Sequence, residues 1–468
     1  MNIENLDFNK IFSLAMDSLD DFSDIFIETR TQTVLSNEGK RLEKAINGII
    51  RGAGIRLISN KKTYYAYTND LTEKNLRGIA KSLKEASRST REEKNGMPLA
   101  LDYKIKKPLV DFKISKDVSA VPVDDKLKLI NPAVKLAWGF DKRVLQVNIT
   151  YSDYEQEVLI ANSLGELIKD LRENVVFFAQ VVVGDGKNVE VGYESSGGFS
   201  GFEFFEKNNP EDITRIALER ALKQLDAPFA SRGTMPVVLS SEAGGTMIHE
   251  AIGHGLEADI AGNGLSVYSG KIGEQVASKL ITVIDDSSLV GKRGFYRFDD
   301  EGTSSGKNIL VENGVLIKYL SDRLSLVKFG YGLTGNGRRQ SYEHVPIVRM
   351  SNTMIAPGNM NPEDIIKSVD GGLFVKKMGG GQVNTVTGDF VFDVMEGYAI
   401  KNGAVGEPVR GATLMGNGPE VLKDIDMVGN DLGFGIGTCG KDGQGAPVSD
   451  AQPTLRIPSI VVGGKSKE

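Results

Sequence analysis

The segment from His249 to His254 constrains this chain more than any other stretch. It reads His-Glu-Ala-Ile-Gly-His and holds two of the three histidines among 468 residues. In the spacing His-Glu-x-x-His, two imidazoles share one face of a helix and can hold one metal ion. Here the histidines are five residues apart, so on a regular helix their side chains would point roughly 140° apart. A regular helix therefore cannot bring both imidazoles to one metal.

Glycines on both sides of His254 remove this obstacle. Gly253 and Gly255 can adopt backbone conformations that other residues avoid. A helix that ends or distorts at Gly253 would swing His254 back beside His249. The apolar run at 236–240 predicts a strand directly before this segment. We therefore predict a strand followed by a broken or wound-out helix end that carries both histidines.

Two further residues fit a catalytic zinc site. Zinc accepts imidazole nitrogen and thiolate sulfur, and a catalytic zinc keeps one position open for water. The single cysteine, Cys439, lies between glycines and small residues that leave room for a metal. Glu250 directly follows one histidine and is placed to take a proton from water. The sequence thus favours His249, His254 and Cys439 as ligands and Glu250 as general base.

Each of these residues also has an ordinary interpretation. A His-Glu pair in a helix is commonly a solvated surface pair, and a single cysteine is commonly a small buried apolar residue. Glu257 and Asp259 are alternative metal ligands, although nothing else explains the setting of Cys439. The third histidine, His344, precedes Val-Pro and is interpreted as a structural residue at a strand start.

Composition narrows the class of protein. Apolar residues make up 40% and charged residues 25% of the chain, as in globular proteins, and the net charge is −6. An acidic balance does not favour nucleic acid or an anionic membrane as a partner. One cysteine excludes an intrachain disulfide, and we find neither a signal peptide nor a membrane-spanning apolar run. We expect a cytoplasmic protein.

The patterning divides the chain into three regions of an α+β protein. We expect an N-terminal α/β lobe at 1–115, a second α/β lobe at 116–230, and a β-rich catalytic domain at 231–468. Apolar periodicity predicts helices at 6–19, 72–87, 123–137 and 211–225. Alternation predicts a hairpin formed by 144–151 and 156–161, and another formed by 174–183 and 188–194.

Three separate motifs carry a family resemblance. They are HEAIGHGLEAD, then GNGRRQSYEHVPIVRMSNTMI at 335–355, then GTCGKDGQGAPVSDAQPTLRI at 437–457. In this order they resemble the TldD/PmbA metalloprotease family. The TldD branch is the more similar one, because PmbA-type subunits typically lack the metal motif and the late cysteine. The resemblance covers most of the chain and is weakest before about residue 120.

The resemblance implies a zinc-dependent peptidase with one zinc ion per active subunit. It would hydrolyse short, unfolded or precursor peptides through a metal-bound water, with ligands at His249, His254 and Cys439 and Glu250 as general base. The fold implied is a mixed α/β N-terminal region followed by a strongly curved antiparallel β-sheet or half-open barrel. Family members pair, so we expect a homodimer or a heterodimer with a metal-free PmbA/TldE-type paralogue.

Arginines within the second motif are candidates for substrate binding. Arg338, Arg339 and Arg349 can hold a peptide carboxylate or backbone through their planar guanidinium groups. Structural ion pairs with Glu343 or with the acidic stretch 257–259 are the alternative. An alternative for the whole protein is a non-catalytic, chaperone-like peptide-binding subunit with a structural metal.

Overall fold

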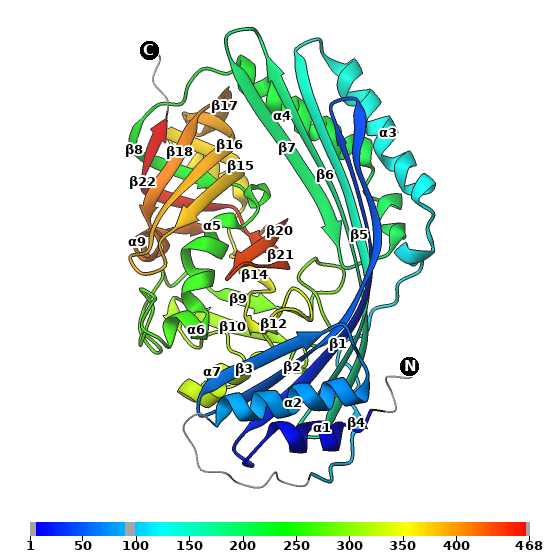
Figure 1. Cartoon of the computed structure of the whole chain (residues 1–468). Coiled ribbons are helices and arrows are strands. Elements are labelled where there is room, and N and C mark those ends of the chain that lie inside the picture. The colour runs from blue at the N-terminus through cyan, green and yellow to red at the C-terminus, as the bar shows by residue number, and fades with distance from the viewer. Residues whose placement is uncertain (1–5, 89–98, 465–468) are drawn as a thin grey trace.

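The N-terminal half of the chain builds one long sheet (Figure 1). The computed structural model describes residues 6–88 and 99–464. The strand order is β3-β2-β1-β5-β6-β4, with β7 beside β6, and all pairs except β4–β6 are antiparallel. The strands are β1 (Phe22–Glu38), β2 (Arg41–Ser59), β3 (Lys62–Thr68), β4 (Lys104–Ile105), β5 (Val144–Asn162), β6 (Glu166–Gly184) and β7 (Val189–Gly198). Strands from both sides of residue 115 share this sheet, and the division at 115 and 230 stays a prediction.

Two pairs of helices pack on this sheet, one pair near each end (Figure 1). All four lie where apolar periodicity predicts them. They are α1 (Phe8–Ala15), α2 (Glu73–Ser87), α3 (Val123–Phe140) and α4 (Pro210–Asp226). Each pair covers its own apolar core, and α3 continues through Pro132. In the described parts of the chain, no helix has both the length and the apolar composition needed to cross a membrane.

One predicted hairpin is wrong. Residues 144–161 do not turn back but form the single strand β5, which pairs with β1 and β6 along its length. The polar stretch in its middle suggests a turn, yet its side chains have buried partners. Asp153 forms an ion pair with Lys126 at 2.5 Å, and Gln156 donates to Glu28 at 2.5 Å. The second predicted hairpin, β6–β7, is confirmed.

The C-terminal region contains a small closed barrel, which confirms the α+β class and the strongly curved sheet. Five strands form a ring in the order β15-β8-β22-β18-β16, and β16 pairs again with β15. The ring is therefore closed rather than half-open, and its β8–β15 pair is parallel. The strands are β8 (Gly233–Leu239), β15 (Gly371–Val383), β16 (Asp389–Lys401), β18 (Ala412–Asn417) and β22 (Leu455–Gly464), with β17 (Ala404–Val409) and β19 (Met427–Val428) attached.

A second C-terminal sheet lies between the barrel and the long sheet (Figure 1). Its order is β11-β10-β9-β14-β21-β20, so β20 is an edge strand. The strands are β9 (Val283–Asp286), β10 (Lys307–Glu312), β11 (Val315–Leu316), β14 (Asn352–Ile355), β20 (Gly433–Lys441) and β21 (Gln444–Gln452). The remaining elements are the pair β12 (Gly337–Arg338) and β13 (Ile347–Val348), and the helices α5 (Thr246–Ile248), α6 (Ala258–Ala261), α7 (Arg323–Phe329), α8 (Pro362–Lys367) and α9 (Gly418–Asp424).

Buried ion pairs join the long sheet to the C-terminal region. Arg56 on β2 has no exposed side-chain surface and binds Asp24 on β1 and Glu301, the latter at 2.6 Å. Arg172 on β6 binds Asp300 at 2.6 Å. Removing one partner of a buried pair typically costs about 3–5 kcal/mol, because a charge is left buried without a partner. The two regions are thus held together at specific positions.

Candidate metal centre

A π-helical turn carries both histidines of the first motif. After β8, the chain passes through α5 into a π-helix at His249–Gly253 and then a 3₁₀ turn at His254–Leu256. The backbone N–H of His254 donates to the carbonyl of His249, five residues earlier. A π-helix makes this i→i+5 bond, and such turns recur at functional sites. The predicted distortion is confirmed, and it places residues five apart one above the other.

The glycines act by allowing close packing rather than by an unusual backbone angle. Gly253 has φ −54°, which any residue can adopt. A Cβ atom at Gly253 would lie 2.2 Å from Sδ of Met350, and one at Gly255 would lie 2.7 Å from Cδ2 of Tyr268. The sequence-based reason for these glycines is therefore corrected: the turn lies against neighbouring side chains that leave no room for a methyl group.

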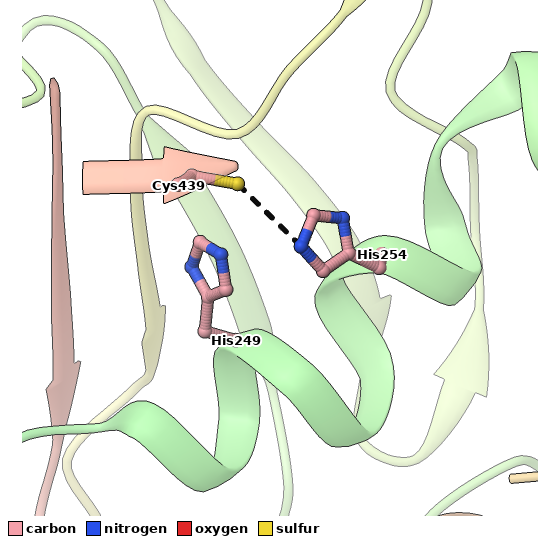
Figure 2. A group of neighbouring side chains, drawn as sticks. All are labelled: His249, His254 and Cys439. Carbon is pink, nitrogen blue, oxygen red and sulfur yellow. Dashed lines mark hydrogen bonds between the residues drawn. The ribbon is translucent and has the colours of Figure 1, made fainter. Parts of the chain in front are cut away.

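The sulfur of Cys439 lies beside the two imidazoles, although it is 185 positions beyond His254 (Figure 2). Cys439 is on β20, and its Sγ is 3.5 Å from Nε2 of His254. The rings of His249 and His254 have centroids 5.0 Å apart and are nearly perpendicular. One potential ligand atom from each residue lies within 4.8 Å of the others, so the group can hold a metal ion. His344 is outside this group, and its Nδ1 lies 2.9 Å from Oγ of Ser341.

A carboxylate orients each imidazole. Nδ1 of His249 is 2.7 Å from Oδ1 of Asp450, and Nδ1 of His254 is 2.9 Å from Oε2 of Glu257. A histidine that ligates a metal usually donates its other ring N–H to such a partner, which fixes the tautomer and raises its basicity. Nε2 of both rings is thereby left for the shared centre. Sequence reasoning missed Asp450, which lies within the third motif but has no spacing signal of its own.

Lys441, on the same strand as Cys439, binds the carboxylate that orients His254. Its Nζ is 3.0 Å from Glu257 and 2.7 Å from Asp259. Burial alone raises the pKa of Glu257, but Lys441 and His254 outweigh it and lower the pKa to about 2. Glu257 and Asp259 thus bind Lys441, and Glu257 also binds His254. The alternative prediction that they are metal ligands finds no support in this arrangement.

The local charges favour a thiolate. Burial raises the pKa of Cys439, but hydrogen bonds from His249 and His254 outweigh it and lower the pKa to about 5. Glu250 is half-buried next to the same group. Burial raises the pKa of its carboxyl group, while the two histidines act in the opposite direction. A thiolate is the form of cysteine that binds metal, and a carboxyl group with a raised pKa is a better proton acceptor.

Arg349 supports the cysteine strand. Its side chain is fully buried, and its guanidinium donates to the carbonyls of Gln444 at 3.2 Å and of Cys439. A substrate cannot reach a side chain with no exposed surface. The predicted substrate-binding role therefore finds no support for Arg349, which instead holds the β20–β21 hairpin in place.

Arg338 and Arg339 lie on the wall of a cavity of about 600 Å³. Arg338 donates to the carbonyls of Met350 and Pro447, and Arg339 donates to the carbonyl of Asp300. Thr438, the neighbour of Cys439, lines the same cavity. Their predicted substrate-binding role stays a prediction, in a cavity that adjoins the strand of Cys439.

Comparison with known proteins matches almost the whole chain to one family. Models of the PmbA/TldA metallopeptidase family match residues 23–89 as domain 1, 116–225 as the central domain and 232–464 as the C-terminal domain. The TldD homologue of Haemophilus influenzae, described as a metalloprotease, is 36% identical over 462 residues, which cover 97% of this chain and 95% of that protein. A metalloprotease of Methanothermobacter thermautotrophicus is also 36% identical and covers 98% of this chain and 99% of its own length.

Solved structures share the fold. A Thermotoga maritima protein superimposes with a TM-score of 0.78 at 22% identity, covering 97% of this chain and 99% of its own. TldE from Thermococcus kodakarensis has a TM-score of 0.74 at 19% identity, covering 95% of this chain and 97% of its own. The family models and the curated relatives together show that the chain belongs to the TldD/PmbA family and is a metallopeptidase.

Proposed function

We propose that this metallopeptidase uses zinc, held by His249, His254 and Cys439, with Glu250 as the general base. The convergence of two oriented imidazoles and one thiolate carries the proposal. Its substrates are short, unfolded or precursor peptides in the cytoplasm.

The donor set fits zinc. Tetrahedral zinc with Zn–N bonds of about 2.05 Å and Zn–S bonds of about 2.3 Å sets sulfur and nitrogen about 3.5 Å apart. The distance from Cys439 Sγ to His254 Nε2 is 3.5 Å. A soft thiolate with two imidazoles is a set that zinc prefers over magnesium or calcium. This sulfur–nitrogen distance and the types of donor atom thus both support zinc.

The chain's own residues would divide the chemistry between them. A bound zinc ion would supply a Lewis acid that makes water a better nucleophile. Glu250 would accept a proton from the attacking water and deliver it to the leaving amine, for which its raised pKa suits it. Asp450 and Glu257 would each accept a hydrogen bond from Nδ1 of their imidazole, which fixes the ring direction and leaves Nε2 as the metal-binding atom.

The position of β20 supports the broad choice of substrates. β20 is the last strand of its sheet and carries Cys439, so an extended peptide can lie along the edge beside the metal centre. Pairing through the main chain is independent of side chains, which suits unfolded peptides. Because Cys439 and Gly437 already accept hydrogen bonds from arginines at their carbonyls, the peptide would use the remaining main-chain groups.

A non-catalytic peptide-binding subunit is the less favoured alternative. A closed site with four protein ligands is typical of a structural zinc, whereas three ligands leave a position open. In the parts of the chain that the structure describes, the group has three members. The likeness to TldE supports pairing of this chain with a TldE-type protein as partner, and a homodimer is the second candidate.

Substituting the proposed base tests the function. We expect Glu250→Gln to retain its metal but to cleave unfolded peptides about 10²–10⁴ times more slowly, because a general base is lost. Glu242→Gln is the matched control, since the Glu242 side chain is 68% exposed and forms an ion pair with Lys376 at 3.6 Å. Metal content is measured on the same samples. Full activity of Glu250→Gln would show that another group takes the proton.

A further inference from the structure

The cavity lined by Thr438, the neighbour of Cys439 on β20, is rich in arginine. It lies between the long sheet and the C-terminal region, and has a volume of about 600 Å³. We call it the arginine cavity after five lining residues: Arg30, Arg172, Arg293, Arg338 and Arg339. Arg30 comes from β1 and Arg172 from β6, whereas the other three belong to the C-terminal region. The cavity therefore exists only where the two regions meet.

Three of these arginines have no acidic partner among the residues that the structure describes. Arg172 is paired with Asp170 and Asp300, and Arg339 lies 3.6 Å from Asp24. Arg30, Arg293 and Arg338, by contrast, have no carboxylate within 4 Å in the described part of the chain. Arg338 is buried, and Arg30 and Arg293 are half-buried. Cations that lose hydration by burial are ordinarily paired. These three leave positive charge in the cavity without a protein counter-ion.

The three carboxyl groups on the cavity wall do not supply that counter-ion. Asp300 is committed to Arg172 and to the backbone N–H of Arg339. Asp299 is fully buried, and burial together with the charge of Glu301 raises its pKa, which reduces its negative charge. Glu343 is exposed to solvent. The positive charge of the cavity thus remains available to a ligand.

Contacts with neighbouring residues hold the guanidinium groups of Arg30 and Arg293 in place. Arg30 lies over the ring of Tyr154, 4.1 Å from its centroid, and its buried Nε has no hydrogen-bond partner among the described residues. Arg293 donates to the carbonyl of Gly437 at 3.3 Å and to Oγ1 of Thr438 at 3.0 Å. Burial lowers the pKa of Arg293, and the charges of Arg338 and Arg30 act in the same direction, whereas Tyr154 acts against them. An anion between them would relieve this repulsion.

We propose that the arginine cavity binds a carboxylate of the peptide substrate, with Arg30, Arg293 and Arg338 as its cationic walls. The inference rests on the proposed peptidase function. Guanidinium groups present planar donor pairs that match a carboxylate. Arg293 donates to the carbonyl of Gly437 and to Oγ1 of Thr438, the two residues before Cys439, so a carboxylate anchored here would contact the strand that carries the cysteine. The carboxylate comes from the C-terminus of the peptide or from an acidic side chain.

Peptide binding to the inactive holoprotein tests the proposal without cleavage. We would measure the Kd values of unstructured peptides on metal-loaded Glu250→Gln protein. One pair of peptides has neutral side chains and differs in a free or amidated C-terminus. A second pair is amidated and differs in one glutamate or glutamine. We expect the carboxylate form of at least one pair to bind about tenfold more tightly, as for a charge-assisted hydrogen bond.

Arginine variants locate the effect. In Arg30→Gln, which leaves β20 and its contacts unchanged, the preference for the carboxylate should fall to about threefold or less. Arg215→Gln on α4 is the control, because its side chain is 46% exposed, pairs with Asp212 and does not line the cavity. The pair that shows the preference identifies the source of the carboxylate. Equal binding of both members in both pairs overturns the proposal, and so does a preference that survives both Arg30→Gln and Arg293→Gln.

These experiments measure binding and not cleavage. Absence of the carboxylate preference would therefore refute the anion site without contradicting peptide cleavage by the wild type. Conversely, a protein that cleaves no peptide but keeps the carboxylate preference would refute the proposed function and not the anion site.

Discussion

Asp450→Asn should weaken metal binding without removing a ligand. Oδ1 of Asp450 lies 2.7 Å from Nδ1 of His249, and its side chain is only 12% exposed. Loss of such an outer carboxylate typically lowers metal affinity 10–100-fold, or about 1.4–2.7 kcal/mol. Asparagine keeps the size and one acceptor oxygen but loses the charge. We therefore expect a loss near the lower end, about tenfold.

The assay is a zinc titration of metal-free protein in competition with a chromophoric chelator at fixed pH. Asp431→Asn is the matched control, because the carboxylate of Asp431 accepts hydrogen bonds from Thr454 at 2.8 and 2.7 Å rather than from a histidine. We expect wild-type affinity from the control. If Asp450→Asn is folded and binds zinc within twofold of wild type, Asp450 does not orient His249 for a metal.

Two further predictions concern the packing of the π-helical turn at Gly253 and the pH dependence of zinc binding. Gly253→Ala places a methyl group 2.2 Å from Sδ of Met350, so the free energy of unfolding, measured with denaturant, should fall by about 1–3 kcal/mol. The control is Gly78→Ala on helix α2, where a new methyl group would meet no atom within 4 Å, and it should be neutral or stabilising. In the metal-free protein, burial lowers the pKa of His254 but Glu257 outweighs it and raises the pKa to about 9. Burial also lowers the pKa of His249, but Asp450 outweighs it and raises that pKa well above the usual value. Both protons must leave before zinc binds, so competition titrations should show zinc affinity rising by more than about tenfold per pH unit from pH 7 to 9; constant affinity would contradict this.

Local signals in the sequence predict the elements and the turn. Helix α4 begins where Asn209 caps the backbone N–H of Glu211 and Pro210 occupies the first turn, a pattern that is readable without any tertiary contact. The spacing of His249 and His254 likewise requires a departure from a regular helix. The structure supplies the particular form, a π turn, and a reason for Gly253 that depends on Met350.

Features that depend on residues distant in the chain cannot be predicted from the sequence alone. The polar middle of β5 is stable as a strand because Lys126 and Glu28, far away in the chain, bind Asp153 and Gln156. Asp450 lies 201 positions from His249, and no spacing rule links the two. The position of Arg30 on the wall of the arginine cavity is visible only when strand β1 and the C-terminal region are seen together.

The register of β20 determines that both Cys439 and Lys441 face the candidate metal centre. In a strand, residues two apart face the same side, so Cys439 and Lys441 share a face. Cys439 reaches the imidazoles, and Lys441 binds Glu257, which in turn orients His254. A shift by one residue would turn both side chains away at once. The pairing of Cys439 with Ala446 and of Lys441 with Gln444 therefore belongs to the site as much as the ligands do.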